Sequence, residues 1–372
     1  MHKLCSGLAL FGVLLGACTP PSELPPMMPA QPDTGWGEED PATSEPAAVT
    51  GAPDEDEDDG WGNATGSTGD AAIDPEPEET GADESTGGLG DGGDGSSSGG
   101  GKVEPRSLAP IIPVPTGACP ALTGGMPELA AFETEDGLRD VHVYSDPEAG
   151  SGGPVVFFFH GSGGNPQQAF AGIGGPSVDA VLAMGGTVVA PAASGEADIE
   201  WFLTTGIGDA DLRVMDEVVG CLHHEGPGID PWQIHVVGFS AGALHASQAS
   251  FRRNAYVASI VGYSGGLAFP GQPQVDEWVP PAMLFHGGAD DVVKGFSFEY
   301  STAAHAIAVG EAGGFCMRCD HQTGHDYPPN EVGVWRRADA LNFLLDHRYG
   351  TESSAYEAFG TPSWVPPYCE VG

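Results

Sequence analysis

The segment Val236-Val237-Gly238-Phe239-Ser240-Ala241-Gly242 decides the fold of this chain. The apolar and β-branched residues before the serine predict a strand, and the stretch Ala241–Arg252 predicts a helix. A turn this sharp brings the strand and helix backbones together, so a side chain at Gly238 or Gly242 would collide. The pattern therefore predicts a strained turn that presents the Ser240 hydroxyl as a nucleophile.

Buried strands alternate with helices on both sides of this turn. This order predicts an α/β fold in which helices cover both faces of a mostly parallel sheet, with sites at the carboxyl ends of the strands. Predicted strands are Leu138–Tyr144, Pro154–Phe159, Gly185–Pro191, Ile234–Phe239, Val257–Tyr263, Ala282–Gly287 and Gly314–Arg318. Predicted helices are Asp209–Leu222, Ala241–Arg252, Phe298–Val309 and Arg337–Arg348, and Gln167–Met184 is partly helical.

Four motifs follow predicted strands or loops, in the order His160-Gly161-Ser162-Gly163-Gly164, Gly238-Phe239-Ser240-Ala241-Gly242, His286-Gly287-Gly288-Ala289-Asp290-Asp291 and Gly324-His325-Asp326-Tyr327-Pro328. With these motifs, the domain from about Gly117 to Tyr349 resembles the α/β-hydrolases. Within them it is most similar to the secreted esterases grouped with polyhydroxybutyrate depolymerases and feruloyl esterases.

The resemblance implies a catalytic triad. A serine hydroxyl needs a base, and the base needs a carboxylate that holds its tautomer and stabilises its cation. Ser240 is then the nucleophile and His325 the base. Asp290 is the expected acid, because it has the family's His-Gly-x-x-Asp spacing, and the adjacent Asp291 is the alternative. His321 is the rival base.

The resemblance also implies donors for the oxyanion of a tetrahedral intermediate. One is the backbone N–H of Ala241, which follows the nucleophile, and the other comes from Ser162 or Gly163. No cofactor or metal is expected. The chain departs from the family pattern at Ala243, where relatives often have a second glycine after the turn.

The N-terminus predicts a lipoprotein signal over residues 1–18. A short apolar stretch, Leu8–Leu15, leads into Leu15-Gly16-Ala17-Cys18, which is similar to a bacterial lipobox. Cys18 would carry the lipid and attach the protein to a membrane. Thr19, rather than aspartate, follows it, which indicates the outer membrane of a Gram-negative cell envelope. A secreted protein with an ordinary signal peptide is the alternative.

Residues 19–105 predict a disordered acidic tether. They are rich in Pro, Gly, Ser, Asp and Glu and contain one basic residue, Lys102. So few apolar side chains cannot offset the entropy of folding. The hydrolase domain is then 106–372. With a net charge of −41 the chain is an improbable partner for nucleic acid, which requires a basic surface.

Beyond Cys5 and Cys18, five cysteines remain: Cys119, Cys221, Cys316, Cys319 and Cys369. In an oxidising compartment we expect disulfides, and pairing of Cys119 with Cys369 would tie the domain ends together. A rival hypothesis is a zinc site, because Cys316, Cys319, His321 and His325 have suitable spacing. That site would remove His325 from the triad.

The motifs together predict an extracytoplasmic serine carboxylic ester hydrolase. By resemblance, its substrates are polyester, feruloyl or acetyl esters, including polymeric ones, and no obligate protein partner is evident. The alternatives are a peptidase or lipase of the same fold, or a non-catalytic surface lipoprotein that binds a ligand.

Overall fold

The computed structural model describes residues 109–194, 201, 209–268, 278–331, 336–351 and 354–371. The predicted signal with Cys18 and the predicted tether lie outside these residues, so both stay predictions. Among the helices described, none is long and apolar enough to cross a membrane.

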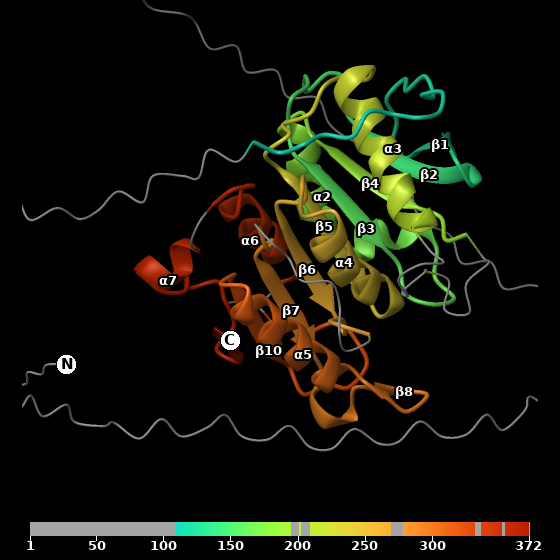
Figure 1. Cartoon of the computed structure of the whole chain (residues 1–372). Coiled ribbons are helices and arrows are strands. Elements are labelled where there is room, and N and C mark those ends of the chain that lie inside the picture. Colours follow the sequence, from blue (N-terminus) through green and yellow to red (C-terminus); the bar gives the residue numbers. More distant parts are fainter. Residues whose placement is uncertain are drawn as a thin grey trace, which may run out of the picture. The chain divides into compact units, whose positions relative to one another are not determined.

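A nine-stranded sheet forms the centre of the domain (Figure 1), in the order β1-β2-β4-β3-β5-β6-β7-β10-β11. The six strands from β4 to β10 are parallel, and β1, β2 and β11 extend the sheet antiparallel at its two sides. The strands are β1 (Glu128–Thr134), β2 (Gly137–Ser145), β3 (Val155–Phe159), β4 (Thr187–Pro191), β5 (Ile234–Phe239), β6 (Ser259–Tyr263), β7 (Ala282–His286), β10 (Cys316–Asp320) and β11 (Cys369–Val371). A separate small hairpin joins β8 (Val292–Val293) to β9 (Phe296–Ser297).

Helices cover both faces of this sheet. They are α1 (Ala169–Ile173), α2 (Gly175–Ala183), α3 (Ala210–His224), α4 (Ala241–Arg252), α5 (Phe298–Glu311), α6 (Ala340–Asp346) and α7 (Ala355–Phe359), with short 3-10 turns at Pro166–Gln168, Gly288–Asp290 and Arg337–Asp339. The core on one face contains residues of α3, α4 and α5, and the core on the other contains residues of α1, α2 and α6. The predicted α/β architecture is confirmed.

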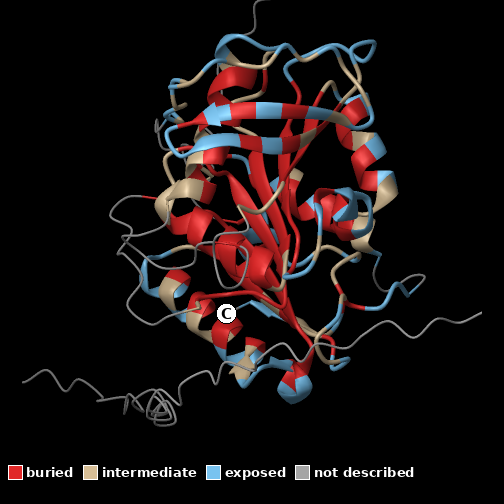
Figure 2. Cartoon of the chain, turned by 90° about the vertical axis from the view of Figure 1, so that its right-hand side faces the viewer, coloured by how far each residue is buried: buried red, intermediate tan, exposed pale blue. Residues whose placement is uncertain are grey.

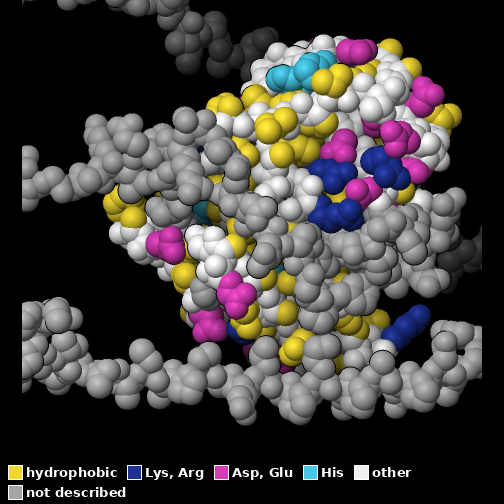
Figure 3. All heavy atoms as spheres, viewed as in Figure 1, with side chains coloured by type: hydrophobic (Ala, Val, Ile, Leu, Met, Phe, Trp, Pro, Cys, Tyr) yellow, Lys and Arg dark blue, Asp and Glu magenta, His cyan; other side chains and the backbone are white. Residues whose placement is uncertain are grey.

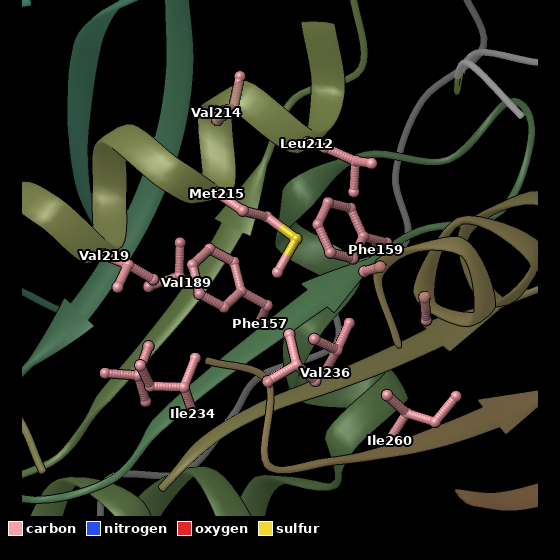
Figure 4. Packing of buried hydrophobic residues seen from close by; sticks show 14 of the residues in the cluster. Phe157, Phe159, Val189, Leu212, Val214, Met215, Val219, Ile234, Val236 and Ile260 are labelled. Atoms are coloured by element: carbon pink, nitrogen blue, oxygen red, sulfur yellow. The ribbon is translucent and has the colours of Figure 1, made fainter. Parts of the chain in front are cut away.

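Alternating side chains of the strands supply these two cores. Phe157 and Phe159 pack with α3 residues such as Met215 on one face (Figure 4), while Val156 and Phe158 belong to the opposite core. Burying five consecutive apolar side chains is typical of a central parallel strand. Figure 2 shows these central strands buried along their length.

The strands that the sequence analysis missed are β1, β8, β9 and β11, whereas β2 corresponds to the predicted strand Leu138–Tyr144. β1 alternates between buried and exposed residues, and β11 has only three residues. These strands and the two-residue strands β8 and β9 lack the continuous apolar run that identified the central strands.

The structure corrects the expected pairing of Cys119 with Cys369. The disulfides are Cys119–Cys221 and Cys319–Cys369, and Cys316 is a buried free thiol. Cys319 and Cys369 lie opposite each other in the antiparallel pair β10–β11, which brings their side chains together. Burial raises the pKa of the Cys316 thiol to about 12. The zinc hypothesis is wrong, because Cys319 is oxidised in a disulfide.

Several basic side chains of the domain are paired with acids. Arg213 pairs with Asp136, and Arg253 binds Asp216 at 2.7 Å. Figure 3 shows Lys and Arg side chains beside Asp and Glu on one face of the molecule.

We expect the double substitution Cys119→Ser and Cys221→Ser to lower the free energy of unfolding by about 2–4 kcal/mol, because the disulfide restrains the unfolded chain. The bridged residues are 102 apart in the sequence. The measurement is denaturant unfolding at pH 7. Cys319→Ser with Cys369→Ser opens a shorter loop of 50 residues and should cost less. An unfolding midpoint equal to that of the wild type would contradict the expectation.

Stability should fall as the pH drops below about 6.5, the ordinary pKa of histidine. Burial lowers the pKa of both His235 and His305 to about 3, so the unfolded chain binds more protons between these values. Each such histidine contributes about 1.4 kcal/mol per pH unit to the slope of stability against pH. Neither ring nitrogen of His305 has a hydrogen-bond partner. His305→Leu should therefore flatten the slope measured by denaturant unfolding, whereas the exposed His224→Asn should leave it unchanged.

Candidate active site

The candidate site lies where five neighbouring strands end. β3, β5, β6, β7 and β10 are adjacent in the sheet, and the four motifs lie at the carboxyl ends of β3, β5, β7 and β10. The loops touch one another closely. Gly324 N–H donates to the Gly287 carbonyl at 3.0 Å, and a Cβ on Gly287 would lie 1.8 Å from the Gly324 oxygen. The loops after β7 and β10 therefore pack together only because Gly287 has no side chain.

Ser240 occupies the strained turn that the sequence predicts. Its φ of 53° and ψ of −122° are rare for a residue with a side chain. A Cβ on Gly238 would lie 2.3 Å from the Gly242 carbonyl oxygen, and a Cβ on Gly242 would lie 2.1 Å from the Phe159 carbonyl oxygen. Both glycines are thus required, and the second lets α4 approach the end of β3.

The structure brings Ser240, His325 and Asp291 into one hydrogen-bonded series. The Ser240 hydroxyl lies 2.9 Å from Nε2 of His325, and Nδ1 of His325 lies 2.7 Å from Oδ1 of Asp291. A proton on Nδ1 donates to the carboxylate and leaves Nε2 free to accept the serine proton. This arrangement can activate a serine for attack on a carbonyl carbon.

The structure corrects the choice of Asp290 as the acid. Asp290 ends the 3-10 turn Gly288–Asp290 and is exposed, whereas Asp291 is fully buried. Because Asp290 lies within the 3-10 turn, the carboxylate that faces the interior belongs to the next residue, Asp291. The family's His-Gly-x-x-Asp spacing counts residues from His286 and does not distinguish these two conformations.

The histidine bonded to Ser240 is His325 and not the rival candidate His321. Nδ1 of His321 lies 2.5 Å from the Thr323 hydroxyl, and the backbone N–H of His321 donates to the carbonyl of His286. Burial lowers the pKa of the His321 imidazole. Ser240 is instead hydrogen-bonded to His325.

Two phenylalanine rings flank the His325 imidazole. Phe298, the first residue of α5, is stacked on it at 4.6 Å between ring centres, and Phe239 lies at 5.3 Å. Tyr327 stacks on Phe239 at 4.4 Å, and the Arg337 guanidinium lies over the Tyr327 ring. Sequence reasoning missed Phe298, because it is a residue of a predicted helix and its contact depends on how α5 packs.

The predicted oxyanion loop lies beside the nucleophile. A Cβ on Gly161 would lie 3.2 Å from Cβ of Ser240, and Gly163 has a φ of 74°. The Ala241 backbone begins α4 immediately after the nucleophile. The roles of Ala241, Ser162 and Gly163 as donors stay predictions.

Trp201 is hydrogen-bonded to His160, the residue at which the predicted oxyanion loop begins. Its indole N–H donates to the His160 carbonyl at 2.8 Å, and the side chain is fully buried against Phe159 and His245. Packing is therefore its role in this structure. In the described part of the chain, no three His, Cys, Asp or Glu side chains are grouped to hold a metal.

No protein-family model matches the chain, and no curated protein matches it. Solved structures do. The native structure of pOPH is similar with a TM-score of 0.53 and 18% identity, over 68% of this chain and 97% of that one. Native sOPH is similar with a TM-score of 0.52 and 17% identity, over 68% and 96%.

This chain has the α/β-hydrolase fold. The resemblance that the motifs indicate is thus confirmed at the level of the fold. An α/β-hydrolase carries its triad in the order Ser, acid, His. Ser240, Asp291 and His325 follow that order.

We expect Asp291→Asn to reduce kcat by about 10⁴-fold, because an amide no longer holds the histidine in the productive tautomer. Asp290→Asn is the matched control, one residue away and exposed, and should retain nearly full activity. The measurement is steady-state hydrolysis of an activated ester at pH 8. The reverse ranking of the two variants would restore Asp290 as the acid.

Proposed function

We propose that the protein is a serine carboxylic ester hydrolase that works through an acyl-enzyme on Ser240. The hydrogen-bonded series Ser240, His325 and Asp291 is the observation that carries this proposal. A nucleophile, a base and a buried carboxylate in contact are what acyl transfer requires.

In the proposed reaction, Ser240 Oγ attacks the ester carbonyl carbon while its proton passes to His325 Nε2. The resulting oxyanion would accept hydrogen bonds from the Ala241 N–H and from the loop of Ser162 and Gly163. Collapse of this intermediate breaks the bond to the alcohol oxygen, which takes the proton from His325. A water molecule, deprotonated by His325, then attacks the acyl carbon, the bond to Ser240 Oγ breaks to release the acid, and His325 returns its proton to Oγ. Asp291 stabilises the imidazolium in both halves.

The substrate proposal rests on resemblance. The four motifs are similar to those of esterases that cleave polyester, feruloyl or acetyl esters, and a pOPH variant of the same fold forms a complex with pNPB. A peptidase or lipase of this fold is the alternative within the same chemistry. A non-catalytic ligand-binding lipoprotein is the alternative outside it.

The location proposal rests on the N-terminal sequence. A lipid on Cys18 followed by the acidic tether would hold the domain at the cell envelope, on the outer membrane, and a secreted form is the alternative. The two disulfides fit an oxidising compartment.

The direct test is hydrolysis of short nitrophenyl esters by the domain from about Lys102 onward. We expect wild-type turnover and a loss of at least about 10³-fold in Ser240→Ala, because no other group can form the acyl-enzyme. Asp290→Asn serves as the active control.

Covalent labelling separates the alternatives. A fluorophosphonate should modify Ser240 and no other serine, which mass spectrometry of peptides can show. A folded wild-type domain that neither hydrolyses esters nor takes the label would contradict an esterase and favour the binding protein.

A further inference from the structure

The buried Ser264 hydroxyl is bonded to the triad acid. Ser264 follows the last residue of β6, and its Oγ donates to Oδ2 of Asp291 at 2.9 Å. The backbone N–H of Gly287 donates to the same oxygen at 3.0 Å. Ser264 and Asp291 both have 0% exposed surface. Two donors on Oδ2 leave Oδ1 to face Nδ1 of His325.

Ser264 adopts a backbone conformation that favours glycine. Its φ is 50°, in the left-handed region, which is costly for a residue with a Cβ. The next two residues are Gly265 and Gly266. Glycine would suit the backbone at position 264 as well, so backbone geometry does not account for a serine there. The contact of its hydroxyl with Asp291 does.

The surrounding structure holds this strained loop in place. Ser264 N–H donates to the Phe285 carbonyl at 2.8 Å, which fixes the loop to β7. The Thr302 hydroxyl of α5 donates to the Gly265 carbonyl at 3.0 Å, and Gly266 N–H donates to the Ser247 hydroxyl of α4 at 3.1 Å. The loop is thus bonded to the helix that follows the nucleophile and to the helix that carries Phe298. A strained residue that is fixed on several sides is typical of a functional site.

We infer that Ser264 is a positioning residue of the triad. Its hydroxyl fixes the rotation of the Asp291 carboxylate, which in turn holds the Nδ1–H tautomer of His325 and aims Nε2 at Ser240. This inference rests on the proposed ester hydrolysis for its kinetic consequence, but the orientation of the carboxylate exists whatever the substrate is.

The decisive variant is Ser264→Gly, which removes the hydroxyl and also relieves the backbone strain. We expect the domain to stay folded, because the relief of backbone strain offsets part of the lost hydrogen bond, and a cooperative thermal unfolding curve checks this. We expect kcat for a nitrophenyl ester to fall about 10- to 100-fold, the scale on which lost outer hydrogen bonds act at other sites, with KM unchanged because Ser264 is buried away from the substrate. In a plot of kcat/KM against pH, the pH at which activity falls on the acid side should also shift. Ser264→Ala should give the same kinetic loss.

An NMR measurement without substrate tests the role of Ser264 independently of the proposed ester hydrolysis. The far-downfield proton NMR signal of His325 Nδ1–H reports its hydrogen bond to Asp291. We expect this signal in the wild type, and we expect it to shift or broaden in Ser264→Gly. The matched control is Ser177→Ala, which removes another buried hydroxyl, one that donates to the Ala338 carbonyl and not to a triad residue. It should leave the signal, kcat and pH profile unchanged.

Each outcome decides one question. If the wild type shows the signal but hydrolyses no ester, the proposed function fails, and the effect of Ser264→Gly on the signal still decides the role of Ser264. If Ser264→Gly keeps the wild-type signal, or keeps wild-type kcat in an active enzyme, Ser264 is not a positioning residue. Absence of the signal in the folded wild type would also overturn the inference, because no oriented pair would then exist.

Discussion

The close approach of the turn at Ser240 to the end of β3 is the constraint on which the site depends. A Cβ at Gly242 would lie 2.1 Å from the Phe159 carbonyl oxygen, so the start of α4 rests directly on the neighbouring strand. This contact sets the height of the nucleophile above the sheet. It also brings the loop at Gly161 beside Ser240, where an oxyanion would form.

A second requirement is the complete burial of the Asp291 carboxylate. Burying a carboxylate is costly unless donors replace its hydration. Asp291 receives hydrogen bonds from His325, Ser264 and Gly287, which come from the loops after β10, β6 and β7. The same three bonds that make the burial tolerable also determine the direction in which the carboxylate points. Stability and catalytic geometry are therefore provided by one set of contacts.

Ala243, which stands where relatives often have a glycine, is accommodated by a glycine in the neighbouring loop after β6. The additional methyl group of Ala243 occupies space that a side chain at position 265 would need, since a Cβ on Gly265 would lie 2.6 Å from Cβ of Ala243. Glycine in the loop after β6 thus makes room for alanine in α4. The substitution leaves the strained conformation of Ser240 intact.

The sequence by itself determined the features that depend on local chain geometry. The apolar runs identified the central strands, and the glycines around Ser240 predicted the strained turn because their steric requirement is local. The motif after β10 similarly indicated His325. Asp290 and Asp291 are adjacent residues of one chemistry, so only burial and a 3-10 turn distinguish them. Disulfide pairing depends on strand register, and the bond from Ser264 to Asp291 joins residues 27 apart. Such contacts arise only when separate strands align at one edge of the sheet, and for this reason the tertiary structure alone decided them.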